Sequence, residues 1–402
     1  MSVAAGPLEN QATSPQPSRY LPLSGLMLAA WIMGAGSAHG VARPARQSDS
    51  LVRIGLLVAA AGGDSARARD ARRGAELAVK QWNARGGVAG RPVALVVRTM
   101  EGPWGSGSKA VVDLVFGERV HAILESLDGR GAHVAEQIVT KSQTPMLSAW
   151  ATDVTLAGAF VPWYFRVVPD DRRQAAALAR EIYGARRYRR VAVAATEAYD
   201  ARVAARAFAR QADSLGRTVT LDLTYRDGTA EVEALVDRIA RSAVDALVLF
   251  GPPARSLTLI RRMAARGLQV PTFASLPFAD ALLCDSCRKD VEGVVFVAPG
   301  HWYAPSGRAL SRAFEATYGT PPGAAAAYAY DGTRVLLGAI ERAGLDRTRI
   351  QYALRQAGPW QGVTGVIQFD ERGNRGGSVE LLIMRGGKPH LLGAGRSGGG
   401  QP

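Results

Sequence analysis

VRIGLLVAAAGGDSARARDARRGAELAVKQWNARGGVAGRPVALVV, residues 52–97, is the stretch that decides the fold of this chain. It opens with an apolar run, Arg53 to Ala60, which predicts a strand buried on both faces and therefore a parallel sheet covered by helices. After a glycine-containing loop, apolar residues recur at helical spacing from about Asp70 to Asn83. A glycine pair ends that helix, and a second strand follows at Val93 to Val97. This is one right-handed βαβ unit, whose loop lies where open α/β sheets bind ligands.

Strands and helices continue to alternate along the chain, in two successive runs. Such alternation predicts doubly wound parallel sheets, and two runs predict two lobes of an α/β protein. The tail departs from this pattern because it is β-rich. Gly365 to Phe369, a turn at residues 370–373 and Val379 to Met384 predict a hairpin, for which the chain has to cross back between the lobes.

Composition limits the classes of function. The chain has 402 residues, 47% hydrophobic and 21% charged, which suits two folded domains and argues against a disordered protein. Its formal net charge of +14 raises nucleic acid as a partner. The positive residues are spread along helices without interleaved aromatic residues, so we expect a solvated basic surface and no nucleic-acid partner.

The first fifty residues resemble an export signal. Arg19 precedes an apolar run, Leu21 to Met33, and small residues follow up to Ala38. We expect a signal peptide at residues 1–38, with an uncleaved membrane anchor as the alternative, and a polar linker at residues 39–50. No cysteine follows the small residues, so no lipid anchor is expected. The mature chain is therefore predicted to be soluble and periplasmic.

Five segments resemble the type I periplasmic solute-binding proteins, in the branch of the leucine, isoleucine and valine receptors of ABC transporters. They are RGAELAVKQWNARGGVAGRPVALVV at 73–97, TPMLSAWATDVTL at 144–156, FRVVPDD at 165–171, PPGAAAAYAYDG at 321–332 and GVIQFDERGN at 365–374. The resemblance implies two lobes joined by three crossovers, near Phe165, Ala298 and Val363. Its implied limits are 51–165 plus 299–363 for the first lobe, 166–298 plus 364–392 for the second, and a disordered tail at 393–402.

In that family the ligand lies between the lobes, and its carboxylate is held by hydroxyls and by N–H groups at helix starts. The resemblance places the carboxylate-binding loop at Asp128 and Gly129, where this chain has no serine. An acid there repels a carboxylate unless it is protonated or paired with Arg130. The other ligand-binding positions implied by the resemblance are Arg67, Trp150, Thr152 and Tyr199.

The family's amino-acid receptors use an acidic residue for the ligand's ammonium group, and the matching position here is Leu276. An aromatic wall of the family is likewise replaced by Pro252 and Pro253. A buried ammonium without a carboxylate costs about 3 kcal/mol or more, so we expect an organic acid or an aromatic molecule rather than an amino acid. The alternative is that Trp150 only fills space and Arg67 is only a solvated loop residue.

The sequence gives little support for catalysis or for a metal or cofactor site. Cys284 and Cys287 are the only cysteines, and such a pair can form a redox centre, half a metal site or a disulfide; export favours the disulfide. No histidine completes a zinc site, the loop at Gly62 and Gly63 is not a dinucleotide-binding motif, and no GxSxG is present. We expect no enzyme, no metal and no cofactor.

These features together predict a monomeric periplasmic protein that closes two lobes around a small-molecule ligand and delivers it to an ABC permease in the inner membrane. The alternative is a periplasmic sensor or interaction subunit that uses the same fold without transport.

Overall fold

The computed structural model describes residues 51–60, 65–101, 104–158, 161–226, 229–283, 287, 289–300, 307–356 and 358–392. The predicted signal peptide, the linker and the tail after residue 392 lie outside these residues and stay predictions. None of the described helices is long and apolar enough to cross a membrane.

The first lobe is built on a five-stranded parallel sheet with the order β2-β1-β3-β4-β5. Ile54 and Leu56 of β1 pack in one core cluster with residues of α1 and α9, whereas Leu57 packs in a second cluster with residues of α2 and α3. This confirms the strand buried on both faces. The strands are β1 (Val52–Ala59), β2 (Val93–Met100), β3 (Ala122–Ser126), β4 (Met146–Ser148) and β5 (Tyr164–Arg166). The helices are α1 (Ser65–Asn83), α2 (Trp104–Val112), α3 (Gly129–Lys141), α8 (Arg308–Tyr318), α9 (Ala324–Ala343) and α10 (Arg347–Gln356), with short turns at Asp113–Gly117 and Val154–Ala157.

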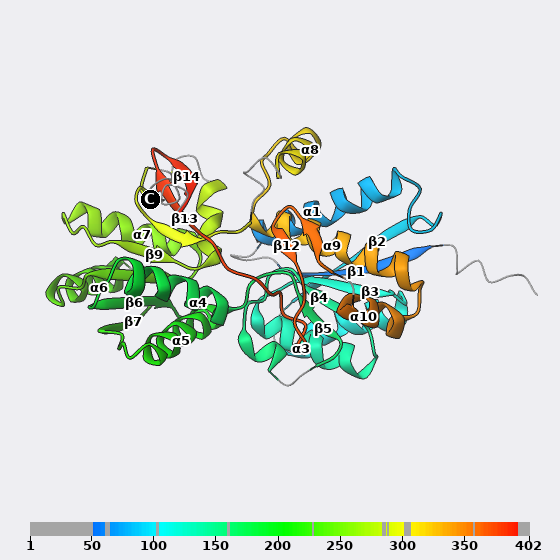
Figure 1. Ribbon diagram of the computed structural model, residues 1–402, viewed down its shortest axis with the longest axis horizontal. Coiled ribbons are helices and arrows are strands. Elements are labelled where there is room, and N and C mark those ends of the chain that lie inside the picture. The colour runs from blue at the N-terminus through cyan, green and yellow to red at the C-terminus, as the bar shows by residue number, and fades with distance from the viewer. Residues whose placement is uncertain are drawn as a thin grey trace, which may run out of the picture. The chain divides into compact units, whose positions relative to one another are not determined.

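The second lobe has a seven-stranded sheet with the order β14-β13-β10-β9-β8-β6-β7. Its strands are parallel from β10 to β7, and β13 and β14 are antiparallel additions. The strands are β6 (Val191–Thr196), β7 (Leu221–Tyr225), β8 (Ala246–Phe250), β9 (Thr272–Ala274), β10 (Val295–Val297), β13 (Leu381–Arg385) and β14 (Lys388–Leu391). The helices are α4 (Asp171–Ala179), α5 (Tyr199–Ser214), α6 (Thr229–Arg241) and α7 (Pro253–Ala265), with short turns at Arg180–Ala185 and Leu276–Leu283. The prediction of two doubly wound α/β lobes is confirmed (Figure 1).

The predicted pairing of the tail is wrong. The segment Gly365–Ile367 forms β12 and pairs with β11 (Trp360–Gly362), whereas β13 pairs with β10 and β14. The reason lies in the turn that follows β12, which is held by the first lobe: the carbonyl oxygen of Gly373 accepts the main-chain N–H of Arg166 at 2.9 Å. Gly373 has φ +80°, and a Cβ there would lie 2.3 Å from the carbonyl oxygen of Tyr164, so glycine is required for this approach. The predicted lobe limits stay predictions.

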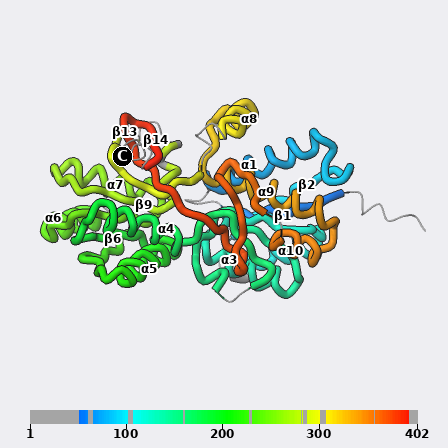
Figure 2. The backbone as a smooth tube through the Cα atoms, viewed as in Figure 1, coloured from blue at the N-terminus to red at the C-terminus, as the bar shows by residue number. Residues whose placement is uncertain are grey.

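The backbone passes between the two sheets three times, after β5, after β10 and before β13 (Figure 2). Arg375 joins the first and third passages, because its guanidinium donates to the carbonyl oxygen of Val167 at 2.8 Å and to Thr364 Oγ1 at 3.0 Å. The buried carboxylate of Asp331 in α9 accepts the main-chain N–H of Thr364 at 2.8 Å. A Cβ on Gly300, in the second passage, would lie 2.5 Å from Thr364 Cα. The three passages therefore meet at Thr364.

Helices α1 and α9 pack closely, although their sequences are more than two hundred residues apart; in Figure 1 the orange α9 runs beside the blue α1. Asp70 of α1 accepts the main-chain N–H of Ala326 at 3.0 Å and so caps the start of α9. Burial raises the pKa of Asp70 to about 6, partly opposed by this bond. Gly74, one turn further on, faces the backbone of Ala326, and a Cβ there would lie 2.1 Å from its carbonyl oxygen.

We expect Gly74→Ala to lower the free energy of unfolding by about 2 kcal/mol or more, because neither backbone can move away without separating the helices. Urea unfolding measures this change. Gly184→Ala is the matched control, since a Cβ there has no atom within 4 Å. Equal effects of the two substitutions would contradict the close contact.

Candidate functional site

A cavity of about 150 Å³ lies between the two lobes. It brings together Arg67, Asp128, Trp150, Thr152 and Tyr199, which are five of the six predicted ligand-binding residues. Each follows the carboxyl end of a strand. The other residues that line it are Asp171, Ala198, Asp200, Ala201, Ala204, Gly251, Pro252, Ser275, Leu276 and Pro277. Their role in ligand binding stays a prediction.

The start of α3 is the predicted anion-binding position. Asp128 caps this helix, since its Oδ1 accepts the main-chain N–H of Gly131 at 2.8 Å. The N–H of Gly129, the sixth predicted residue, is already used, because it donates to Asp200 Oδ1 of the second lobe at 2.9 Å. A Cβ on Gly129 would lie 2.9 Å from that oxygen and 3.0 Å from Tyr199 Cε1, so a side chain here would displace Asp200 or Tyr199. A carboxylate of the protein itself therefore occupies the position where the ligand's carboxylate was expected.

The two aromatic residues of the cavity each carry an arginine on one ring face. The guanidinium of Arg67 lies 5.1 Å from the ring centroid of Trp150, which is 4% exposed. The guanidinium of Arg130 lies 5.2 Å from the ring centroid of Tyr199. Arg67 thus lines the cavity and stacks on its wall, whereas Arg130 stacks on Tyr199 without lining the cavity itself.

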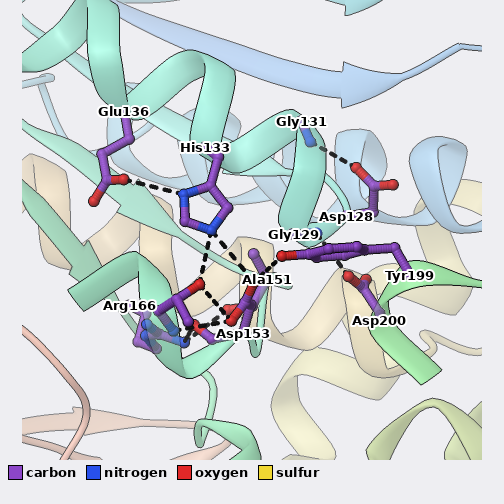
Figure 3. Close-up of polar contacts among 11 residues, drawn as sticks. Asp128, Gly129, Gly131, His133, Glu136, Ala151, Asp153, Arg166, Tyr199 and Asp200 are labelled. Carbon is purple, nitrogen blue, oxygen red and sulfur yellow. Dashed lines mark hydrogen bonds and ion pairs between the residues drawn. The ribbon is translucent and has the colours of Figure 1, made fainter. Parts of the chain in front are cut away.

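A chain of polar contacts connects the lobes beside the cavity (Figure 3). Tyr199 Oη donates to Asp153 Oδ2 at 2.7 Å, and the same oxygen lies 3.3 Å from His133 Nε2. The other ring nitrogen of His133 lies 3.4 Å from Glu136 Oε2. Hydrogen bonds to Asp153 and Glu136 raise the pKa of His133 to about 9. Burial works against ionisation of Asp153, but hydrogen bonds from His133, Thr155 and Tyr199 outweigh it and hold the pKa of Asp153 below its usual range. His133 and Asp153, both in the first lobe, therefore form an ion pair at neutral pH, and Tyr199 of the second lobe donates to the carboxylate of this pair.

Two acidic residues of the cavity were missed by sequence reasoning. Asp171 begins α4, is 3% exposed, and its Oδ2 has no hydrogen-bond partner within the described part of the chain. Burial raises the pKa of Asp171 to about 8 and that of Asp200 to about 6. Their position in the sequence could have identified them. Each acid stands in the first turn of a helix that follows a segment on the ligand side.

The loop between β4 and β5 is held in place by Arg166, which is fully buried. Its Nη1 donates to the carbonyl oxygens of Asp153 at 2.9 Å and Ala151 at 3.3 Å. Ser148 Oγ accepts the main-chain N–H of Ala151 at 3.0 Å. These bonds fix Thr152 at the cavity and Asp153 beside it.

Leu276 and Pro252, where the sequence departs from the amino-acid receptors, both line the cavity. Leu276 is fully buried, and its main-chain N–H donates to Gln174 Oε1 at 3.0 Å. Cys287 is buried and is not a free thiol, but Cys284 lies outside the described residues, so the disulfide stays a prediction. In the described ranges no group of three His, Cys, Asp or Glu side chains is arranged to hold a metal ion.

Comparison with known proteins agrees with this architecture. A family model described as periplasmic binding protein matches residues 51–387. The chain belongs to the periplasmic binding protein family. Leu/Ile/Val-binding protein homolog 1 of Brucella melitensis is 24% identical over 353 residues, which cover 87% of this chain and 92% of that protein.

Solved structures extend the comparison. The leucine binding protein LivK from Thermotoga maritima has a TM-score of 0.75 and 25% identity, covering 85% of this periplasmic binding protein and 97% of that chain. A solute-binding protein of an ABC transporter from R. palustris, in complex with benzoate, has a TM-score of 0.76 and 19% identity. The match covers 85% of this chain and 95% of that chain. The resemblance to the Leu/Ile/Val receptors and the type I fold are confirmed.

The ion pair at His133 predicts a pH-dependent contribution to stability. The pKa of about 9 in the folded protein exceeds the unfolded value of 6.5, so this contribution is complete below pH 6.5 and is lost as the pH rises through about 9. Because the side chain is partly exposed, we expect a loss of about 1–2 kcal/mol.

Urea unfolding of the wild type and of His133→Gln at several pH values measures this loss. The difference between the free energies of unfolding of the two proteins cancels the titration of other groups. His390→Gln, in β14, controls for the loss of a histidine. A difference that does not change with pH would contradict the ion pair.

Proposed function

We propose that this protein captures a small molecule in the cavity between its lobes and delivers it to an ABC permease. One observation carries the proposal: the residues that line the cavity follow the carboxyl ends of strands in both sheets. Asp128 follows β3 and Trp150 follows β4 in the first lobe, whereas Tyr199 follows β6 and Leu276 follows β9 in the second. Open α/β sheets bind ligands at this edge, and two such edges enclose a molecule from both sides.

Ligand binding and lobe closure are coupled in this proposal. A molecule that contacts Trp150 in one lobe and Tyr199 in the other favours the arrangement in which both walls meet it. The bond between Tyr199 and Asp153 and the bond between Asp200 and Gly129 stabilise the same arrangement. A permease then distinguishes the loaded protein by the surface that closure creates.

The sequence predicts an organic acid or an aromatic molecule. The residues that line the cavity support an aromatic molecule more than an organic acid. Trp150 and Tyr199 provide flat apolar surfaces, which support an aromatic or apolar ligand, and the R. palustris protein of the same fold is described with benzoate. An organic acid is disfavoured, because the carboxyl groups of Asp128, Asp171 and Asp200 line the same small cavity. We therefore propose a molecule with an apolar or aromatic body and without a carboxylate.

A thermal-shift screen of aromatic compounds, organic acids, amines and amino acids against the mature protein tests capture. We expect a ligand that raises the melting temperature, and we expect Trp150→Ala to weaken its binding about tenfold or more through the loss of apolar contact. Tyr352→Ala, at a side chain that is 62% exposed, is the control and keeps the affinity of the wild type.

Delivery is tested separately, by uptake of that ligand into cells that lack the gene. Lost uptake supports transport. Unchanged uptake would contradict transport and favour a sensor.

A further inference from the structure

The charges around the cavity are not balanced. Among the described residues that line it, three carry carboxyl groups, Asp128, Asp171 and Asp200, and one carries a positive charge, Arg67. The carboxyl group of Asp128 caps α3, and that of Asp200 accepts the N–H of Gly129. Asp171 Oδ2 has no hydrogen-bond partner among the residues that the structure describes. The cavity therefore has a spare buried acceptor.

Asp200 decides whether a ligand's carboxylate is accepted. The first N–H group of α3 and the positive end of its dipole favour an anion, and the carboxylate of Asp200 is already 2.9 Å from that N–H. A second carboxylate in the same place would meet Asp200 in a partly buried site, where like charges repel strongly. A ligand that relies on a carboxylate is therefore excluded while Asp200 stays there.

Asp171 requires a donor. Its side chain is 3% exposed, and a buried carboxyl oxygen without a donor is costly. An ammonium group offers several N–H donors and the missing positive charge in one compact group. Burial raises the pKa of Asp171 to about 8, and a positive charge bound beside it would stabilise its charged form.

We propose that the cavity takes a compact amine without a carboxylate, whose ammonium group donates to Asp171 while its hydrocarbon body lies between Trp150 and Tyr199. This inference rests on the proposed function, since it names the class of molecule that the same cavity captures. It also accounts for Leu276, because the acidic partner of the ammonium group is at the start of α4 instead of in the loop after β9.

Matched compounds test the inference. Isoamylamine, leucine and isocaproate share one branched skeleton. The first carries an amine, the second an amine and a carboxylate, and the third a carboxylate alone. Phenethylamine, phenylalanine and hydrocinnamate form the same series on an aromatic skeleton. Isothermal titration of the full mature chain with each compound gives six affinities. We expect an amine to bind about tenfold or more tightly than the zwitterion and the acid of its skeleton.

Two variants assign the effect to the acids. Asp171→Asn keeps the shape of the side chain and removes the charge, and we expect it to weaken binding of the amine about 10- to 100-fold. Asp200→Ala frees the N–H of Gly129, and we expect leucine and isocaproate to gain affinity relative to isoamylamine. Asp222→Asn, at an exposed carboxylate of β7, is the matched control and leaves all six affinities unchanged. Unfolding of each variant by heat checks that it is folded.

The outcomes separate the two proposals. Tighter binding of an amine that is lost in Asp171→Asn supports the inference. Tighter binding of a zwitterion or an acid by the wild type would overturn it and would leave capture of a small molecule standing. Absence of binding by all six compounds would also overturn it, and capture is then decided by the wider screen and the uptake measurement alone.

Discussion

The buried guanidinium of Arg166 is the interaction on which the candidate site depends. A charge removed from water needs hydrogen-bond acceptors, and the carbonyl oxygens of Ala151 and Asp153 supply two of them. The loop after β4 therefore folds around this side chain. That folding turns Thr152 toward the cavity and Asp153 toward the second lobe. The main chain of Arg166 also donates to Gly373, so the same residue holds the segment that leads to the third crossover.

This arrangement couples the cavity to the hinge through a short stretch of chain. Val167 follows Arg166 and accepts a hydrogen bond from Arg375. Asp171, the first residue of α4, comes shortly after it in the chain. The proposed contact between a ligand and Asp171 therefore lies next to the first crossover. Because Arg375 and Thr364 connect that crossover to the third, a change at one passage is transmitted to another without a long path through either core.

Local pattern was enough for the architecture and for much of the cavity. The limits of β8 and α9 follow from continuous apolar or alanine-rich runs, whereas Trp150 and Tyr199 were found through the resemblance to the Leu/Ile/Val receptors. Apolar spacing does not mark the start of α3, since its first turn is rich in glycine and is stabilised by the cap of Asp128. The pairing of β12 could not be predicted, because it depends on contacts with β5 and α9 that are distant in the sequence. The burial of Asp171 and the contact of Asp200 with Gly129 of the facing lobe depend on the folded chain, which no local pattern records.

The two missed acids change the meaning of Leu276. Its presence removes a negative charge from the loop after β9, and from the sequence alone this argues against any ligand with an ammonium group. In the folded chain two carboxyl groups lie instead in the first turns of α4 and α5. One of these acids, Asp200, holds the N–H of Gly129 and closes the position of an incoming carboxylate, whereas the other, Asp171, has an oxygen without a donor. In the proposed site the acidic partner of the ligand therefore lies at the start of α4 instead of in the loop after β9, so Leu276 does not remove it.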